Sequence, residues 1–277
     1  LVDTKPTTFD ELIRISGLSH GTDVWLGNAQ SLIEQGIVTL QDAICCRDDI
    51  MIYLIKMGLP PNPAFKIMET VRKGKALKDP AKWEEYKTMM KEHNVPDWYI
   101  KSCEKIKYMF PKAHAAAYVT NAFRIAWFKV HMPLAYYAAF FSIRGKDDFD
   151  SDCMIFGKEK VKNKMKEIDL LGNSATQKDK TMYPILELVL EMYERGFEFL
   201  PMDLYKSDAT KFIVEDNALR PPLNSIPGLG TVAALGIAEA RKDGKFMSID
   251  DLKIRSKVGN SVTDILKKYG CLKGMSQ

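Results

Sequence analysis

The segment Phe110–Pro133 reads FPKAHAAAYVTNAFRIAWFKVHMP, and it determines most of what the sequence says about the fold. Pro111 suits the first position of a helix, where its missing N–H costs nothing, and Pro133 prevents the helix from continuing. We therefore predict one helix of about 20 residues. At helical spacing, one face is polar and aromatic near the N-terminal end and apolar further along. That face comprises His114, Tyr118, Asn121, Ile125, Phe128 and Met132.

The start of this predicted helix carries Lys112 and His114, with Tyr118 one turn further on. Free N–H groups and the helix dipole favour anions at such an end. A phosphorylated planar ligand, such as a nucleotide, would suit this combination of cation, imidazole and aromatic ring. The alternative is a buried helix in which the alanines permit close packing and His114 is satisfied within the core. The residues alone leave both interpretations open.

The composition is that of a folded protein. A length of 277 residues is enough for two domains. The content of 46% apolar and 27% charged residues is typical of folded domains with cores of their own. No run of eighteen apolar residues and no signal peptide is present, so we expect a soluble, cytoplasmic protein without membrane contact. The cysteines form no CxxC pair, which favours reduced, mostly buried thiols over disulfides or zinc ligands. They are Cys45, Cys46, Cys103, Cys153 and Cys271.

Charge is distributed unevenly along the chain. The overall net charge is +4, but residues 1–60 carry −4, residues 61–147 carry +8, residues 148–205 carry −4 and residues 206–277 carry +4. Two basic blocks separated by acidic ones are typical of a chain with two separate polyanion contacts. Solvated charged faces would give the same distribution, so charge alone leaves this open.

The pattern of apolar residues predicts a mainly α protein. Up to residue 147 the apolar residues recur at helical spacing and strand signals are scarce. The charged stretch RGKDDFDSD at 144–152 breaks this pattern, and we place a domain boundary there, giving domains 1–147 and 148–277. The second domain is predicted to be α-rich, with short strands in 197–205 and in 209–223 and a helix–hairpin–helix at about 222–273.

The hairpin sequence SIPGLGT at 225–231 has two glycines that allow a tight turn just before a helix starting at about Thr231. The N–H groups of that helix start would point at a phosphate. Such a contact would hold a DNA backbone without reading its sequence. The alternative is a tight turn between helices without a ligand. The candidate DNA-binding residues are Gly228, Leu229, Gly230, Thr231, Arg241, Lys242 and Lys245.

Three motifs resemble one known family. The string at 110–133 resembles the fingers of C-family bacterial replicases. Together with ISGLSHGTDVW at 15–25 and NSIPGLG at 224–230, it resembles the C-terminal part of the PolC-type DNA polymerase III alpha subunit of low-GC Gram-positive bacteria. The resemblance implies a fingers domain at 1–147 and a duplex-binding domain at 148–277. The segment VGNSVTDILKKYGCL at 258–272 resembles a degenerate second hairpin that lacks its second glycine.

The resemblance also implies a place for the incoming dNTP. Arg72, Lys73, Lys75 and Lys78 crowd around Gly74, where replicative fingers carry cations for the triphosphate. Arginine makes bidentate phosphate contacts, so Arg72 is the main candidate and the lysines are secondary. By chemistry alone the cluster could be a solvated helix end.

Further residues of this implied pocket come from two segments. The resemblance assigns Lys112 and His114 to phosphates and Tyr118 to base or sugar. It also implies a loop near the pocket that carries Ser19 and His20. An N-capped turn with Trp25 buried is the alternative for that loop.

We predict no metal site in this chain. The carboxylates of DDFDSD at 147–152 lie in a charged connector without strand signals, whereas a two-metal site needs rigidly held carboxylates. His114 and His131 would be separated by roughly 25 Å along one helix, which rules out a shared ion. The resemblance implies Mg²⁺ in the parent enzyme, held by a palm domain that this chain lacks.

The sequence therefore predicts a fragment of a replicative DNA-directed DNA polymerase. It would bind primer-template DNA and dNTP but would not polymerise alone. In the parent protein its partners would be the palm, the thumb and, through a terminal peptide absent after residues 274–277, the sliding clamp. One alternative is a non-enzymatic helix–hairpin–helix scaffold that binds DNA structure. Another, a base-excision glycosylase, lacks its expected downstream catalytic aspartate.

Overall fold

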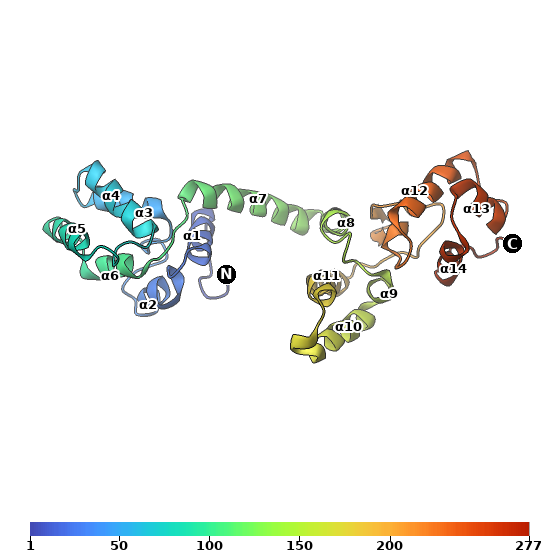
Figure 1. Cartoon of the computed structure of the whole chain (residues 1–277), viewed down its shortest axis with the longest axis horizontal. Helices are drawn as coiled ribbons and strands as arrows, with labels where there is room; N and C mark the ends of the chain where they lie inside the picture. The colour runs from blue at the N-terminus through green and yellow to red at the C-terminus, as the bar shows by residue number, and fades with distance from the viewer. Residues whose placement is uncertain (277) are drawn as a thin grey trace. The chain divides into compact units, whose positions relative to one another are not determined.

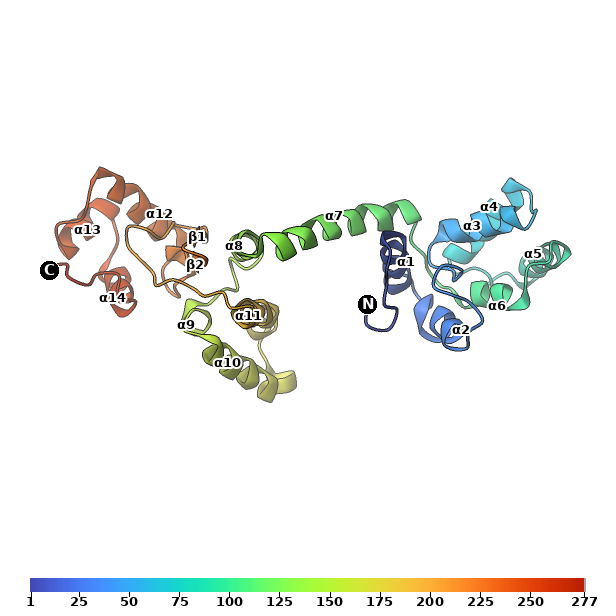
Figure 2. The ribbon, with the colours of Figure 1, turned by 180° about the vertical axis from the view of Figure 1, so that it is seen from behind.

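The computed structural model describes residues 1–276, and helices dominate it (Figure 1). Within those residues the only sheet is an antiparallel pair of short strands, β1 (Ile213–Glu215) and β2 (Ala218–Arg220) (Figure 2). The predicted mainly α fold is confirmed. The chain divides into two compact units, residues 1–124 and residues from 125 onward, and the division falls within a long helix.

The first unit is built from short helices with clear sequence signals at their ends. Thr8 and Glu11 form a capping box at the start of the first helix, and prolines open two others. The helices are α1 (Phe9–His20), α2 (Gln30–Glu34), α3 (Arg47–Lys56), α4 (Pro61–Arg72), α5 (Pro80–Glu92) and α6 (Asp97–Lys105), with an irregular turn at Trp25–Ala29.

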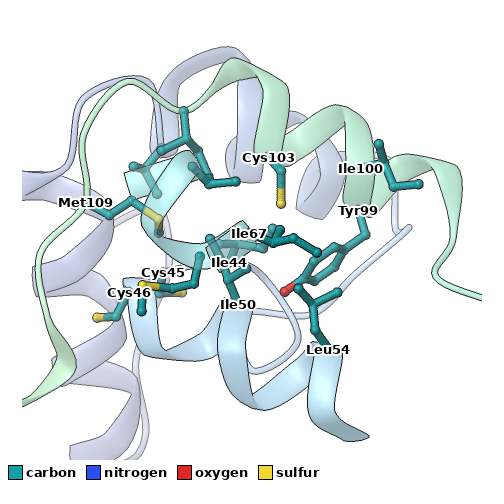
Figure 3. Close-up of a cluster of buried hydrophobic side chains, with 14 of the residues drawn as sticks. Ile44, Cys45, Cys46, Ile50, Leu54, Ile67, Tyr99, Ile100, Cys103 and Met109 are labelled. Carbon is teal, nitrogen blue, oxygen red and sulfur yellow. The ribbon is translucent and has the colours of Figure 1, made fainter. Parts of the chain in front are cut away.

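One hydrophobic core holds this unit together. Helices α3 and α4 pack against each other, and Tyr99 of α6 is fully buried in the same core beside Ile50 and Leu54 (Figure 3). The thiols of Cys45, Cys46 and Cys103 are buried here as well, and burial raises the pKa of Cys46 to about 12. They are therefore inert packing residues, as predicted.

The second unit contains two cores. Aromatic rings dominate the first, in which Tyr137 and Phe141 of α8 pack with Phe149 and Phe212. Aliphatic side chains from the C-terminal helices form the second. The helices are α8 (Pro133–Ile143), α9 (Ser151–Met154), α10 (Lys158–Leu171), α11 (Gln177–Glu194), α12 (Thr231–Ala240), α13 (Ile249–Ser256) and α14 (Asn260–Lys268), with 3-10 turns at Gly172–Ser174, Leu223–Ser225 and Arg241–Asp243.

The predicted helix between Pro111 and Pro133 is α7 (Lys112–His131), which has 20 residues as expected. The alternative of a buried helix with His114 in the core is wrong, because Ala115 is the only residue of α7 that is buried and His114 is exposed. The boundary placed at 147–148 stays a prediction for functional domains. By packing, α8 shares a core with residues that follow that boundary, including Phe149 and Leu186.

Candidate functional site

The segment 106–111 connects the parts of the first unit that the sequence singled out. The N–H of Thr22, just after α1, donates to the carbonyl of Tyr108 (2.9 Å). On the other side, the N–H of Met109 donates to the carbonyl of Arg72 (3.3 Å). The segment then leads directly into α7. Three stretches that are distant in sequence are thereby fixed side by side.

A small aromatic pocket lies at the start of α7. The Phe110 ring stacks on His114 with centroids 5.3 Å apart and planes inclined by 15°, and His114 lies 4.6 Å from Tyr118. His20, from the end of α1, meets Phe110 edge-on at 6.1 Å. These four side chains line the pocket together with Ser16 and Ala115. The structure thus brings three predicted site residues, His20, His114 and Tyr118, into one place.

Ser19 does not line this pocket, and its hydroxyl donates to the Ser16 carbonyl (3.2 Å). The expectation that Ser19 and His20 lie in a loop is wrong, because α1 extends through His20. The N–H of Gly21 still donates to the carbonyl of Gly17, so the helical bonding ends only at Gly21. The loop was predicted because Gly17 and Gly21 flank these residues, but Gly17 lies within α1 and Gly21 directly follows it.

The start of α7 is not an open anion site. The N–H of Lys112 donates to the Asp48 carboxylate (2.6 Å), and the Lys112 ammonium donates to Asp10 (3.0 Å). The hydrogen bond from Lys112 is the main cause that lowers the pKa of Asp10. Carboxylates of the protein itself therefore occupy the position at which we expected a phosphate. The contact between Asp10 and Lys112 is solvent-exposed, so a ligand could displace it.

The basic cluster after α4 is organised by the carboxylate of Glu69, which is not among the predicted site residues. Glu69 accepts hydrogen bonds from the Arg72 guanidinium and forms an ion pair with Lys73 (2.8 Å). Arg47 approaches the same carboxylate at 3.8 Å. The bonds from Arg72 and Lys73 lower the pKa of Glu69 to about 2. Spacings of three and four residues on one helix could have indicated these pairs.

Gly74 ends this helix with φ +61°, and a Cβ there would lie 2.5 Å from the Lys107 carbonyl. Only glycine fits such a position. The turn leaves Lys75 exposed and places Lys78 in a shallow basic pocket. That pocket is lined by the lysines Lys73, Lys78, Lys105 and Lys107, with Asp23 paired to Lys107 at 2.6 Å.

The predicted hairpin in the second unit is a tight turn that leads directly into α12. Gly228 has φ +86°, and the buried Leu229 donates its N–H to Ile226 (3.0 Å). Gly230 is the N-cap of α12, and its carbonyl accepts from Ala234. Within residues 1–276, the N–H groups of residues 230–233 have no hydrogen-bond acceptor, so they are free at the helix start.

Gly230 is not required by the fold. Its φ of −68° and ψ of 157° suit any residue, and a Cβ would meet nothing within 4 Å. Gly228 differs, because its backbone conformation favours glycine and a Cβ would lie 3.0 Å from Ile265. The space in front of Gly230 is therefore open to an approaching group from outside the chain.

A second hairpin of the same form precedes α14. Lys257 has φ +56° where the first hairpin has Gly228, and the buried Val258 corresponds to Leu229. Gly259 caps α14 with ordinary dihedral angles, and a Cβ on it would also meet nothing within 4 Å. The prediction that this copy lacks the second glycine is therefore wrong, because Lys257 replaces the first glycine and Gly259 retains the second.

The three predicted cations near the first hairpin differ in their contacts. The Arg241 guanidinium donates to the carbonyls of Leu204 (2.8 Å) and Ser207 (2.7 Å), so it holds a neighbouring loop. Lys242 forms an exposed pair with Glu239 at 2.5 Å, and Lys245 is exposed.

The carboxylates at 147–152 do not converge on a common point. Asp148 accepts from the Thr181 hydroxyl (2.6 Å), and Asp150 caps α9. Asp152 accepts from the Tyr269 hydroxyl (2.6 Å) and from Lys268. No group of three potential metal ligands occurs in residues 1–276, so the side chains present do not fit a Mg²⁺ site.

Along the same residues, no helix is both long and apolar enough to cross a membrane.

Comparison with known families gives two matches. The profile of the bacterial DNA polymerase III alpha subunit finger domain matches residues 1–94. The profile of the helix-hairpin-helix motif matches residues 196–277. The first match contains α1 and the basic cluster, and the second contains both hairpins.

Curated relatives match along almost the entire chain. The PolC-type DNA polymerase III of Oceanobacillus iheyensis is 58% identical over 99% of this chain. That of Bacillus subtilis is also 58% identical over 99%, and that of Caldanaerobacter subterraneus is 55% identical over 100%. In each case the chain spans 19% of the relative's own length.

Proposed function

Because this chain belongs to the PolC-type DNA polymerase III family, we propose that it binds the incoming dNTP and duplex DNA within a replicative polymerase. The chain spans about a fifth of the length of its relatives in that family. The first unit would bind the nucleotide, and the hairpins of the second unit would bind phosphates of the primer-template. The chain would contribute positioning and charge neutralisation to nucleotidyl transfer.

The observation that carries the DNA-binding part is the pair of unobstructed glycines, Gly230 and Gly259. Neither is needed for backbone conformation or packing. Within residues 1–276, the N–H groups of residues 230–233 have no acceptor at the first helix start, and those of residues 259–261 have none at the second. A side chain at either position would obstruct a phosphate approaching the helix start. Backbone contacts of this kind bind any sequence, which suits a polymerase.

The nucleotide part rests on the two clusters joined by segment 106–111. Arg72 and Lys73 share the carboxylate of Glu69, so a triphosphate would compete with Glu69 for both cations. The ring surfaces of His114 and Tyr118 would receive the planar base or the sugar, since Tyr118 is 66% exposed. Lys75, Lys112 and His20 would add polar contacts.

Catalytic Mg²⁺ would be supplied with its ligands by a palm domain elsewhere in the parent polymerase. No step of the reaction is assigned to a metal on this chain, because the carboxylates present do not fit one. The palm, the thumb and the sliding clamp would be the protein partners, and the cytoplasm would be the place of action.

Gly230→Ala tests the DNA-binding part directly. Labelled primer-template duplex is titrated with the chain, and fluorescence anisotropy reports binding. The variant should lose at least tenfold in affinity while its circular dichroism spectrum stays unchanged, because no atom of the chain is displaced. Equal affinity of variant and wild type would contradict phosphate binding at this hairpin.

Two further measurements separate a polymerase part from a DNA scaffold. With Mg²⁺, primer-template and all four dNTPs, the chain should bind without extending the primer. Arg72→Ala should weaken dNTP binding and leave duplex binding unchanged. If Arg72→Ala has no effect on dNTP affinity, a non-enzymatic DNA-binding scaffold becomes the better interpretation.

A further inference from the structure

A groove leads away from the first hairpin in the second unit. Asn224, Gly230 and Thr231, at and near the start of α12, line this groove. Lys211 and, just after α8, Lys146 line the same groove. It thus connects the free N–H groups of the hairpin with two lysines that come from separate segments.

The wall that carries Lys211 is held in place from both sides. The Asp208 carboxylate accepts the N–H of Lys211 (2.9 Å), which fixes the loop internally. The next residue, Phe212, donates its N–H to the Ser142 hydroxyl of α8 (2.9 Å). On the hairpin side, the N–H of Leu223 donates to the Asp208 carbonyl (2.9 Å). Lys211 therefore projects from a rigid position between α8 and the hairpin.

The two lysines of the groove are available to a ligand. Lys146 and Lys211 are exposed, and neither forms a salt bridge with any residue of the described part of the chain. Lys206 in the same loop region differs, because Glu215 pairs with it at 3.2 Å. Asp147 also lines the groove, and its charge opposes that of the lysines.

We propose that this groove carries the phosphodiester backbone of the bound duplex onward from the first hairpin, with Lys211 and Lys146 contacting further phosphates of the same strand. The inference rests on the proposed function, since it takes the N–H groups at Gly230 as the first phosphate contact. Unpaired ammonium groups and free N–H groups that line one groove are complementary to a chain of negative charges. Thr231 and Asn224 line the same path and add hydrogen-bonding groups.

The test measures duplex binding of the full chain by anisotropy over a salt series. The variant Lys146→Gln with Lys211→Gln is compared with Lys164→Gln and Lys166→Gln on α10, which removes the same charge outside the groove. Each lost phosphate contact reduces the slope of log affinity against log salt by about 0.9, so the groove variant should lose about 2 in slope and roughly tenfold in affinity. The α10 variant should keep the wild-type slope. Asp147→Asn should tighten binding.

Three outcomes would distinguish a failure of the proposed groove contacts from a failure of the proposed hairpin contact. A groove variant with the slope and affinity of the α10 variant would overturn the groove while leaving the hairpin function intact, provided that Gly230→Ala still loses binding. Loss of slope in the groove variant together with normal binding by Gly230→Ala would support the groove and contradict the hairpin. Absence of duplex binding by the wild-type chain would overturn both. Equal melting temperatures of all variants would exclude unfolding as the cause.

Discussion

Gly236 of α12 lies so close to Ser256 that a Cβ on Gly236 would be 2.7 Å from the Ser256 carbonyl oxygen. Ser256 ends α13 and directly precedes the second hairpin. Gly228 of the first hairpin in turn lies against Ile265 of α14, the helix that follows the second hairpin. Each hairpin is therefore supported by a helix of the other copy, and the two hairpins form one packed unit.

Gly236→Ala should destabilise this packed unit by about 1–3 kcal/mol, because the added methyl group clashes with backbone rather than with a flexible side chain. Urea unfolding followed by circular dichroism measures the change. Gly230→Ala is the matched control and should change the free energy of unfolding by only about 0.5 kcal/mol, since its Cβ enters open space. Equal destabilisation by the two substitutions would show that the close contact does not matter.

Lys257→Gly should stabilise the chain by about 1 kcal/mol, because a lysine at φ +56° pays a steric cost that glycine avoids. Lys257→Ala removes the same charge but retains the strained backbone, so it should not stabilise. Thermal unfolding compares the two. If the Lys257 ammonium contacts a DNA phosphate at the second hairpin, Lys257→Gly should also weaken duplex binding. The same substitution would then raise folding stability and lower duplex affinity. A melting temperature for Lys257→Gly at or below that of Lys257→Ala would contradict the strain argument.

Local signals in the sequence predicted the parts of the fold that depend on neighbouring residues. Pro111 and Pro133 delimit α7 to within two residues, and the glycine pattern located the first hairpin. What could not be predicted depends on contacts across the sequence. Asp48 caps the N–H of Lys112 from 64 positions away, and no periodicity indicates such a pair.

The candidate site was predictable to a similar extent. His114 and Tyr118 were predicted from residue type and helical spacing, and His20 from the family resemblance. Their convergence depends on tertiary contacts such as the bridge between Thr22 and Tyr108. The missing glycine of the second hairpin was assigned to the wrong position, because the left-handed residue of that hairpin is Lys257 rather than a glycine.

Glu69→Gln should raise the affinity for a nucleoside triphosphate a few-fold, because the carboxylate competes with phosphates for Arg72 and Lys73. Titration of the chain with a fluorescent dNTP measures the change. Glu84→Gln is the control, since Glu84 forms an equivalent pair with Lys87 on α5. Tighter binding in both variants would point to overall charge rather than to this site, and weaker binding by Glu69→Gln would mean that Glu69 positions Arg72 instead.

Glu69 also makes stability depend on pH in the acid range. Its pKa falls from 4.5 to about 2 on folding, so its contribution is fully present above pH 4.5 and is lost as pH falls from there toward 2. Glu69→Gln lacks this ionisation, and its melting temperature should therefore decline less steeply than that of wild type between pH 4.5 and pH 2. Parallel declines of the two proteins would show that the ion pairs with Arg72 and Lys73 contribute nothing in solution.

Tyr118 offers the most direct test of how the pocket at the start of α7 holds a planar group. Its ring lies 4.6 Å from His114, which itself stacks on Phe110, so the three rings present one continuous aromatic surface. Stacking of a base on such a surface contributes about 1–3 kcal/mol, which is roughly 5- to 150-fold in affinity. Tyr118→Ala should therefore lose dNTP affinity in this range, whereas Tyr118→Phe retains the ring and should bind within about twofold of wild type. Equal loss in both variants would assign the contribution to the hydroxyl, and no loss in either would place the base elsewhere.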